Sequence, residues 1–136
     1  MNAKELMISD WVLHEGEPYQ IRQLGIFGVD RDGEDYPAVC IGKPNGIGII
    51  LERNEIEPIP LTPEILEKNG FKKKGYRYGI YDDYFDFEMH EYNDGTWLVS
   101  YHCCEMSLPD EQLLICYIHQ LQHFMRHCGI EKEIEL

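Results

Sequence analysis

Histidines recur at intervals of four near the end of the chain, at His119, His123 and His127. Side chains four residues apart lie on one face of a helix, so His119 and His123 could hold one zinc ion. The segment from His119 to His123 resembles the His-Glu-x-x-His motif of zinc proteases, but Gln120 stands where that motif has its general base. An amide cannot take a proton from water, which disfavours hydrolysis. A zinc-dependent hydrolase is therefore only the third of three functional hypotheses.

The chain has one cluster of basic side chains, and aromatic side chains stand within it. Its members are Lys72, Lys73, Lys74, Tyr76, Arg77 and Tyr78. Proteins use cations together with aromatic rings to hold phosphates and to stack bases. The same residues also suit a hairpin turn whose lysines keep a sheet edge from pairing with another chain. The second hypothesis is a small-ligand binding protein that holds a phosphate or nucleotide at this hairpin.

A polar stripe is predicted on the C-terminal helix, opposite its apolar stripe. The apolar stripe consists of Leu114, Tyr117, Ile118, Leu121, Phe124, Met125 and Cys128. The polar stripe would face solvent or a protein partner, and its members are Gln112, Cys116, His119, His123 and Arg126. Clustered histidines acquire like charges below about pH 6.5, which would make such a contact sensitive to pH.

Five cysteines are present, in an odd number and at irregular spacing, which indicates free thiols in a reducing compartment. Cys103 and Cys104 are adjacent, but Glu105 beside them would raise a thiol pKa and so disfavour a nucleophile. The sequence contains no glycine-rich phosphate loop, nucleophile elbow or ordered Ser/His/Asp set. We therefore predict no catalytic residues and no cofactor.

The formal net charge is −13, with −6 in residues 1–61 and −7 in residues 62–136. Such a field repels nucleic acids and makes a basic protein surface the natural complement. No apolar run approaches the ~18 residues of a membrane span. The first residues lack a basic region followed by an apolar core, so they do not read as a signal peptide. We therefore expect a cytoplasmic protein with a protein partner and no membrane.

The predicted fold class is α+β. A first lobe is predicted at residues 1–61 and a second at residues 62–136, and the two are expected to form one compact unit.

The first lobe shows four or five short strands separated by glycine-rich turns. They are predicted at residues 10–14, 19–24, 37–41 and 47–51, with a further short segment at 56–59. This density of bent strands is typical of a small SH3-like β-barrel.

The second lobe is predicted to hold a short connecting helix, a β-hairpin layer and one long C-terminal helix. Thr62 and Pro63 begin the short helix, and Asn69 and Gly70 end it. A hairpin is predicted over residues 84–102, with its turn at 93–95. The long helix is predicted from a cap at Ser107 to Cys128, and residues 130–136 alternate as an edge strand would.

The segment Ile56–Phe71 joins the two lobes, and its prolines make it stiff. Its helix carries Ile65 and Leu66, which need a surface to bury against. We expect this helix to lie between the barrel and the hairpin layer as a structural joint, without a binding or catalytic role.

Three stretches resemble a family of small uncharacterised proteins of gut anaerobic bacteria and of their phages and mobile elements. They are Leu6–Val12, the central run Ile56–Phe71 (IEPIPLTPEILEKNGF) and the C-terminal run Tyr117–His123 (YIHQLQH). The resemblance spans most of the chain, but it implies no activity and no functional residue. Together with the charge, it gives the first hypothesis, a non-enzymatic accessory or protein-interaction module.

Overall fold

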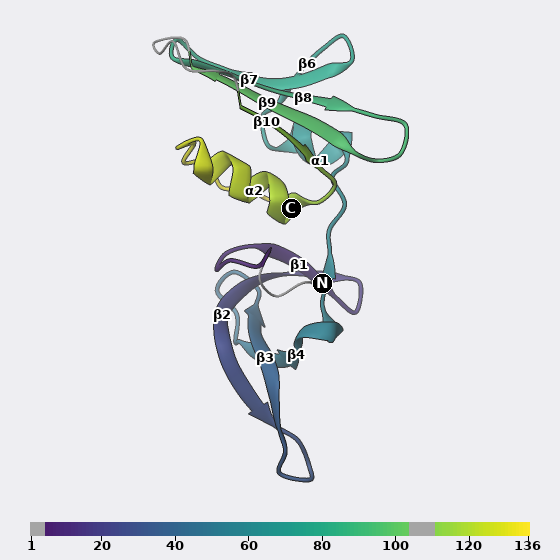
Figure 1. The fold of residues 1–136 in the computed structure, drawn as a ribbon, viewed down its shortest axis with the longest axis vertical. Helices are drawn as coiled ribbons and strands as arrows, with labels where there is room; N and C mark the ends of the chain where they lie inside the picture. The colour runs from purple at the N-terminus through teal and green to yellow at the C-terminus, as the bar shows by residue number, and fades with distance from the viewer. Residues whose placement is uncertain (1–4, 104–110) are drawn as a thin grey trace. The chain divides into compact units, whose positions relative to one another are not determined.

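The computed structural model describes residues 5–103 and 111–136. The chain divides into two compact units, Met1–Ile59 and Pro60–Leu136. Each unit contains a five-stranded sheet in which all the pairings are antiparallel (Figure 1). The fold is therefore mostly β, and the predicted α+β class is wrong.

The first unit is a single open sheet. Its strands are β1 (Trp11–His14), β2 (Glu17–Val29), β3 (Asp35–Gly42), β4 (Ile49–Glu52) and β5 (Glu57–Pro58), with the short 3-10 helix η2 (Arg53–Glu55) before β5. The order is β4-β3-β2-β1-β5, so β4 and β5 are the two edges of the described sheet. The predicted barrel is wrong because β5 is only two residues long and ends in Pro58, which has no amide hydrogen to extend a ladder.

One face of this sheet supplies the core of the first unit. Its buried residues are Leu6, Val12, Ile21, Val39, Ile41 and Ile56. Val39 and Ile41 alternate with Cys40 along β3, as the period of two in a strand requires. The sequence pattern therefore placed a strand at each of the five positions, but β2 is much longer than predicted and the sheet does not close into a barrel.

The distal parts of β2 and β3 form a two-stranded arm. Register shifts between Ile21 and Ile26 mark its base, and beyond them Phe27 pairs with Pro37 and Val29 with Asp35. No other strand of the described sheet pairs with this part, and Figure 1 shows the hairpin reaching beyond it. Gly28 has no side chain, and the Tyr36 ring lies over it so closely that an added Cβ would be 2.2 Å from Cζ.

The second unit is an antiparallel meander with two helices. Its elements are α1 (Pro63–Lys68), β6 (Lys72–Lys74), β7 (Arg77–Tyr81), β8 (Phe85–Glu91), β9 (Trp97–Cys103), β10 (Glu111–Ile115) and α2 (Ile118–His127). The strand order is β10-β9-β8-β7-β6. Strands that follow one another in the sequence are therefore adjacent in this sheet.

The predicted short helix is confirmed as α1. The Thr62 hydroxyl oxygen accepts a hydrogen bond from the Ile65 amide at 3.3 Å, as an N-cap does. At its end Gly70 has a φ of 82°, and the Phe71 amide donates to the Leu66 carbonyl at 3.0 Å. The predicted hairpin is also confirmed, because Phe87 pairs with Tyr101 and Met89 with Val99.

The predicted long helix is wrong, because its first half is the strand β10. Leu113 pairs with Val99 and Ile115 with Trp97, which adds β10 to the sheet. The predicted cap at Ser107 lies outside the described residues. The side-chain oxygen of Gln120 accepts from the amides of Cys116 at 2.8 Å and Tyr117 at 3.2 Å, and so starts α2 after the strand.

The helix α2 covers one face of the second sheet (Figure 1). Phe87 of β8 lies 5.8 Å from the Phe124 ring of α2 and 6.1 Å from Phe71. Of the predicted apolar stripe, Leu121, Phe124 and Met125 are buried as expected. No helix in the described part of the chain is long and apolar enough to cross a membrane.

The C-terminal residues do not form the predicted edge strand. Instead, the side chain of the buried Asn69 makes two hydrogen bonds to the backbone of Glu135. Its Nδ2 donates to the Glu135 carbonyl at 2.8 Å, and its Oδ1 accepts from the Glu135 backbone amide at 2.7 Å. These two bonds satisfy polar groups that would otherwise be costly to bury. Ile134 beside them is buried, so the C-terminal segment is held against the end of α1.

We predict that Gln120→Ala destabilises the protein by about 1–2 kcal/mol, because two backbone amides lose their acceptor while helix propensity hardly changes. Chemical denaturation of the full chain measures the free energy of unfolding. Gln112→Ala, at an exposed position of β10, is the matched control and should change it by less than about 0.5 kcal/mol. Equal effects of the two substitutions would contradict the assigned role of Gln120.

Candidate functional site

The predicted basic cluster forms the hairpin of β6 and β7. Lys74 pairs with Arg77 across the turn, where Gly75 has a φ of 64°. The Lys74 ammonium lies 3.9 Å from the centroid of the Tyr81 ring, a distance suited to a cation–π contact. Gly79 permits this arrangement, because an added Cβ there would be 2.6 Å from Tyr81 Cζ.

Glu88 of β8 connects the aromatic and cationic side chains of this face. One carboxylate oxygen lies 3.0 Å from the Arg77 guanidinium, and the other accepts the Tyr81 hydroxyl at 3.1 Å. Burial raises the pKa of Tyr81, and the hydrogen bond to Glu88 raises it further. The hydrogen bond to the same carboxylate raises the pKa of Arg77.

Further ring contacts on the same face involve β8 and the turn that follows it. His90 lies 4.8 Å from the Tyr76 ring and stacks on Tyr92 at 5.1 Å with an interplanar angle of 19°. Arg77 also lies over Tyr76, at 5.6 Å from the ring centroid. We call the set Lys74, Tyr76, Arg77, Tyr81, Glu88, His90 and Tyr92 the aromatic–cation face.

The strand period separates the six predicted ligand residues. Tyr78 points to the opposite face of the sheet, where it is buried and lies 5.8 Å from the Trp97 ring. Lys73 follows it there, 5.9 Å above the Tyr78 ring. Lys74 and Arg77 belong to the aromatic–cation face, and Tyr76 is in the turn. Lys72 lies two residues before Lys74 in β6 and so points to the same side of the sheet.

A small hollow of about 130 Å³ opens on the aromatic–cation face. Arg77, His90, Ser100 and Gln112 supply its polar groups, and Glu88 lines it as well. Binding sites for drug-sized molecules are typically about 300–1,000 Å³. The hollow therefore suits a group the size of a carboxylate or phosphate, and a whole nucleotide would extend beyond it.

The histidines of α2 do not have the predicted common environment. His119 is 1% exposed and stacks on Tyr117 at 5.9 Å, whereas His127 is exposed. His119 and His123 have ring centroids 5.8 Å apart at an angle of 74°. Across the described residues, no group of three or more His, Cys, Asp or Glu side chains is placed to hold a metal ion. A third ligand for His119 and His123 is therefore not found there.

The other residues of the predicted partner-facing stripe lie on different elements. Gln112 is on β10, Cys116 is in the link before α2, and only Arg126 shares the helix with His119 and His123. His123 borders a hollow of about 430 Å³ together with Gln112, Leu113, Phe124 and His127. One helical stripe through all five predicted residues does not exist, because the helix begins at Ile118.

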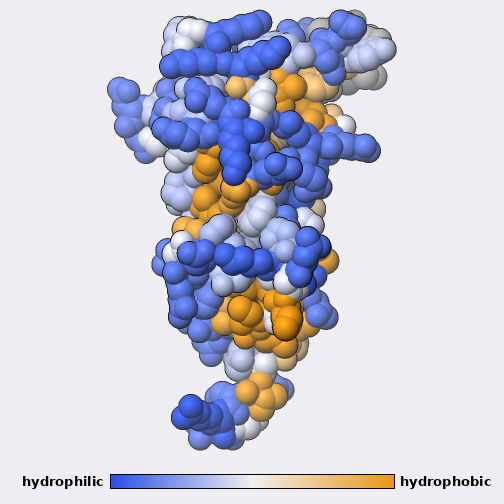
Figure 2. Space-filling view, turned by 180° about the vertical axis from the view of Figure 1, so that it is seen from behind, coloured by the Kyte–Doolittle hydropathy of each residue, from blue (hydrophilic) through white to orange (hydrophobic). Residues whose placement is uncertain are grey.

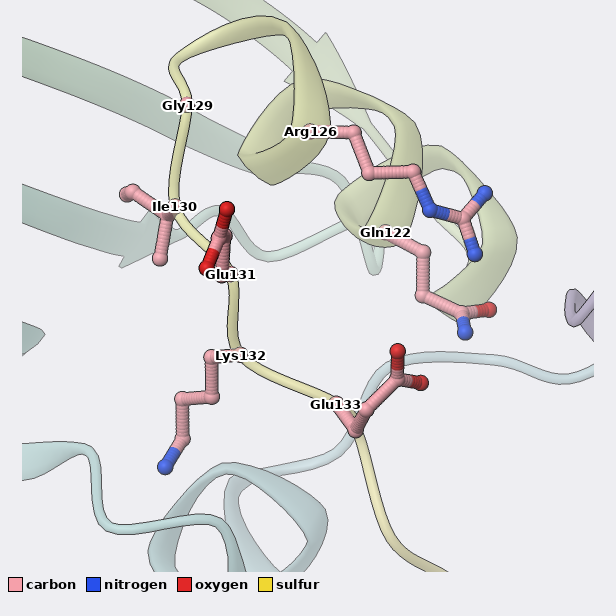
Figure 3. Close-up of a pocket in the computed structure, with 7 residues that line it drawn as sticks. All are labelled: Gln122, Arg126, Gly129, Ile130, Glu131, Lys132 and Glu133. Carbon is pink, nitrogen blue, oxygen red and sulfur yellow. The ribbon is translucent and has the colours of Figure 1, made fainter.

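Another hollow, of about 460 Å³, lies between α2 and the C-terminal segment. Figure 3 shows Gln122 and Arg126 projecting from one side of α2, with the Glu133 carboxylate pointing back toward them. Glu131 and Lys132 also line it. Its charges are mixed and nearly balanced, which gives it no preference for a ligand of one sign.

Sequence reasoning missed a surface in the first unit. We call it the apolar edge, and its residues are Phe27, Val29, Ile47, Ile49 and Ile50. Ile47 is 91% exposed, Phe27 71% and Ile50 57%. Figure 2 shows apolar side chains reaching the surface of this unit. No signal in the sequence indicates this exposure, because an apolar run such as residues 47–51 is typical of a buried strand.

Comparison with protein-family models, with curated proteins and with solved structures found no match to this chain.

We predict that Glu88→Gln lowers the pKa of Tyr81 toward its ordinary value, because the substitution removes the carboxylate that holds the phenol proton. Part of the increase should persist, since burial is its larger cause. NMR of ¹³Cζ-labelled tyrosine during a titration measures the change. Tyr101 is the internal control, because its raised pKa comes from burial and from Cys103 and Cys128. An unchanged Tyr81 pKa would contradict the hydrogen bond.

Proposed function

We propose that the chain is a non-enzymatic protein-interaction module, an accessory protein of phage or mobile-element origin that acts in the cytoplasm. The observation that carries this proposal is the apolar edge of the first unit. The family resemblance supports the origin, and the free thiols of Cys40, Cys103 and Cys116 support a reducing compartment.

The exposure of the apolar edge favours a contact with another protein. Soluble monomers expose single apolar side chains routinely, but clusters of them usually mark an interaction site. Here Ile49 and Ile50 of β4 pair with Ile41 and Cys40 of β3, and Phe27 and Val29 of β2 pair with Pro37 and Asp35 at the other end of β3. The exposed side chains thus border one strand, β3, along its length.

The charge of the protein favours a basic partner. The net charge is −13, and both halves of the chain are acidic. Acidic surfaces attract basic proteins over about 10 Å at physiological salt and discourage association with nucleic acids. An apolar contact surrounded by acidic residues is the arrangement expected for a basic protein partner.

The test is affinity capture by the full chain from a lysate of the bacterium that encodes it, with quantitative mass spectrometry. The double variant Phe27→Ser/Ile47→Ser is expected to lose the captured partner by at least tenfold, because both side chains are exposed and their loss leaves the fold intact. The matched control is Tyr84→Ser/Leu114→Ser, which alters two exposed apolar side chains in the second unit, of which Tyr84 is 60% and Leu114 59% exposed.

Two results would contradict the proposal. One is a wild-type chain that captures no protein above background. The other is a partner that the Phe27→Ser/Ile47→Ser variant captures as well as the wild-type chain does. Circular dichroism of both double variants verifies that they are folded.

The hollow on the aromatic–cation face favours a second candidate, a protein that binds a small anionic ligand. Arg77, His90 and Ser100 offer donors around a space suited to a phosphate or carboxylate group. An anion there would have to compete with Glu88 for Arg77, which places this candidate second.

A thermal-shift series with inorganic phosphate and nucleotides tests this second candidate. Binding to the folded state raises the melting temperature with ligand concentration. The expected result is a shift with phosphate, relative to chloride at equal ionic strength, that Arg77→Gln abolishes. A flat response of the wild-type protein would exclude the candidate.

A further inference from the structure

We propose that β4 accepts an extended segment of a basic partner as an additional antiparallel or parallel strand of the first sheet. The proposal deepens the proposed function, on which it rests, by naming the edge that is used and the chemistry of the segment that occupies it. Strand addition draws its affinity from main-chain hydrogen bonds and its selectivity from alternate side chains.

The outer edge of β4 is available for such pairing. β4 lies at one end of the sheet order, and within the described sheet it pairs with β3 alone. The outward amide and carbonyl groups of an edge strand are a template for another strand. Ile49, Ile50 and Leu51 provide apolar side chains along it, and the exposed Ile47 precedes them.

Other edges of the same chain carry residues that prevent pairing. β6 consists of Lys72–Lys74, and β5 is Glu57–Pro58 followed by Pro60. Lysines and prolines on an edge strand are the usual protection against added strands. Ile49–Leu51 has neither, so β4 is an edge without that protection.

The edge strand β10 differs from β4 in what lies beside it. Leu113 of β10 borders a hollow together with His123, Phe124 and His127, so α2 side chains lie next to that edge. Leu114 is 59% exposed, close to the 57% of Ile50. This similarity makes Leu114 a suitable control position for Ile50.

A hollow lies past the end of β4. Glu52 is the last residue of β4 and pairs with Ala38, and η2 follows it and contacts β3. The hollow has a volume of about 290 Å³ and is lined by Tyr36, Pro37, Glu52, Arg53 and Asn54. A side chain at the end of the added segment has room there.

Charges near this path favour a basic segment over a second copy of the chain. Glu52 ends β4 and Arg53 follows it, and residues 30–35, at the far end of the β2–β3 arm, contain four acidic side chains and one arginine. A second copy carries the same net charge of −13 and would be repelled. A segment that alternates Lys or Arg with apolar residues would place its cations beside these carboxylates.

The experiment uses the full chain and a fluorescent eight-residue peptide of alternating lysine and valine. Anisotropy measures the affinity, and amide chemical shifts locate the binding. The expected result is binding with shifts centred on Ile49–Glu52. A peptide with every second backbone amide methylated keeps the charge but cannot complete a ladder, and it should bind at least tenfold more weakly. The corresponding glutamate–valine peptide should not bind.

Matched variants separate β4 from other exposed apolar positions. Ile50→Ser should weaken binding of the lysine–valine peptide roughly tenfold, because it removes an apolar side chain that the added strand would cover. Leu114→Ser, of the same chemistry on β10, should leave the affinity within twofold. Neither substitution changes the charge of the protein, so an ionic effect cannot explain a difference.

Three results would overturn the proposal: equal binding of the methylated peptide, equal effects of Ile50→Ser and Leu114→Ser, or a dimer in sedimentation that Ile50→Ser dissociates. The last result would assign the edge to a second copy. If affinity capture still depends on Phe27 and Ile47 while the peptide results fail, the proposed function stands and strand addition alone is rejected. If the capture fails as well, both are rejected.

Discussion

The side-chain oxygen of Gln120 determines where a strand ends and a helix begins in the second unit. It accepts hydrogen bonds from the amides of Cys116 and Tyr117, the two residues that link β10 to α2. Because the helix starts there, β10 is free to pair with β9, and α2 can turn back across the sheet. The aromatic contact between Phe87 and Phe124 depends on that reversal. One buried face of the sheet is covered as a result.

The same junction shows which parts of the fold could be predicted from the sequence. Local signals sufficed where the determining contacts are near in sequence, as in the Thr62 cap of α1 and the hairpin around Asp94, whose carboxylate accepts from the Thr96 amide. Local signals gave the wrong prediction at residues 111–115. The apolar residues there fit a helical period, but pairing with β9 makes the segment a strand. The prediction of a barrel was wrong for a similar reason, because barrel closure depends on contacts between strands that are far apart in the sequence.

The candidate sites show a related division. The basic residues and tyrosines of the hairpin were recognisable by type. The structure is needed to show that Tyr78 lies on the opposite face of the sheet and that Glu88 and His90 belong to the aromatic–cation face. The predicted stripe through Gln112 and Arg126 required a continuous helix and disappeared with it. The apolar edge was overlooked because residues 47–51 suited a buried strand, and burial is a property of the whole sheet.

The arm formed by β2 and β3 has a thermodynamic consequence. Beyond its base it is a two-stranded ribbon, held by its own ladder and by the Tyr36 ring over Gly28. An isolated pair of strands is only marginally stable in water, so the arm should open far more often than the sheet beneath it. Its amide hydrogens would then exchange with solvent well before those of Val39 and Ile41. An element of low local stability can adapt its shape to a binding partner without disturbing the core that supports it.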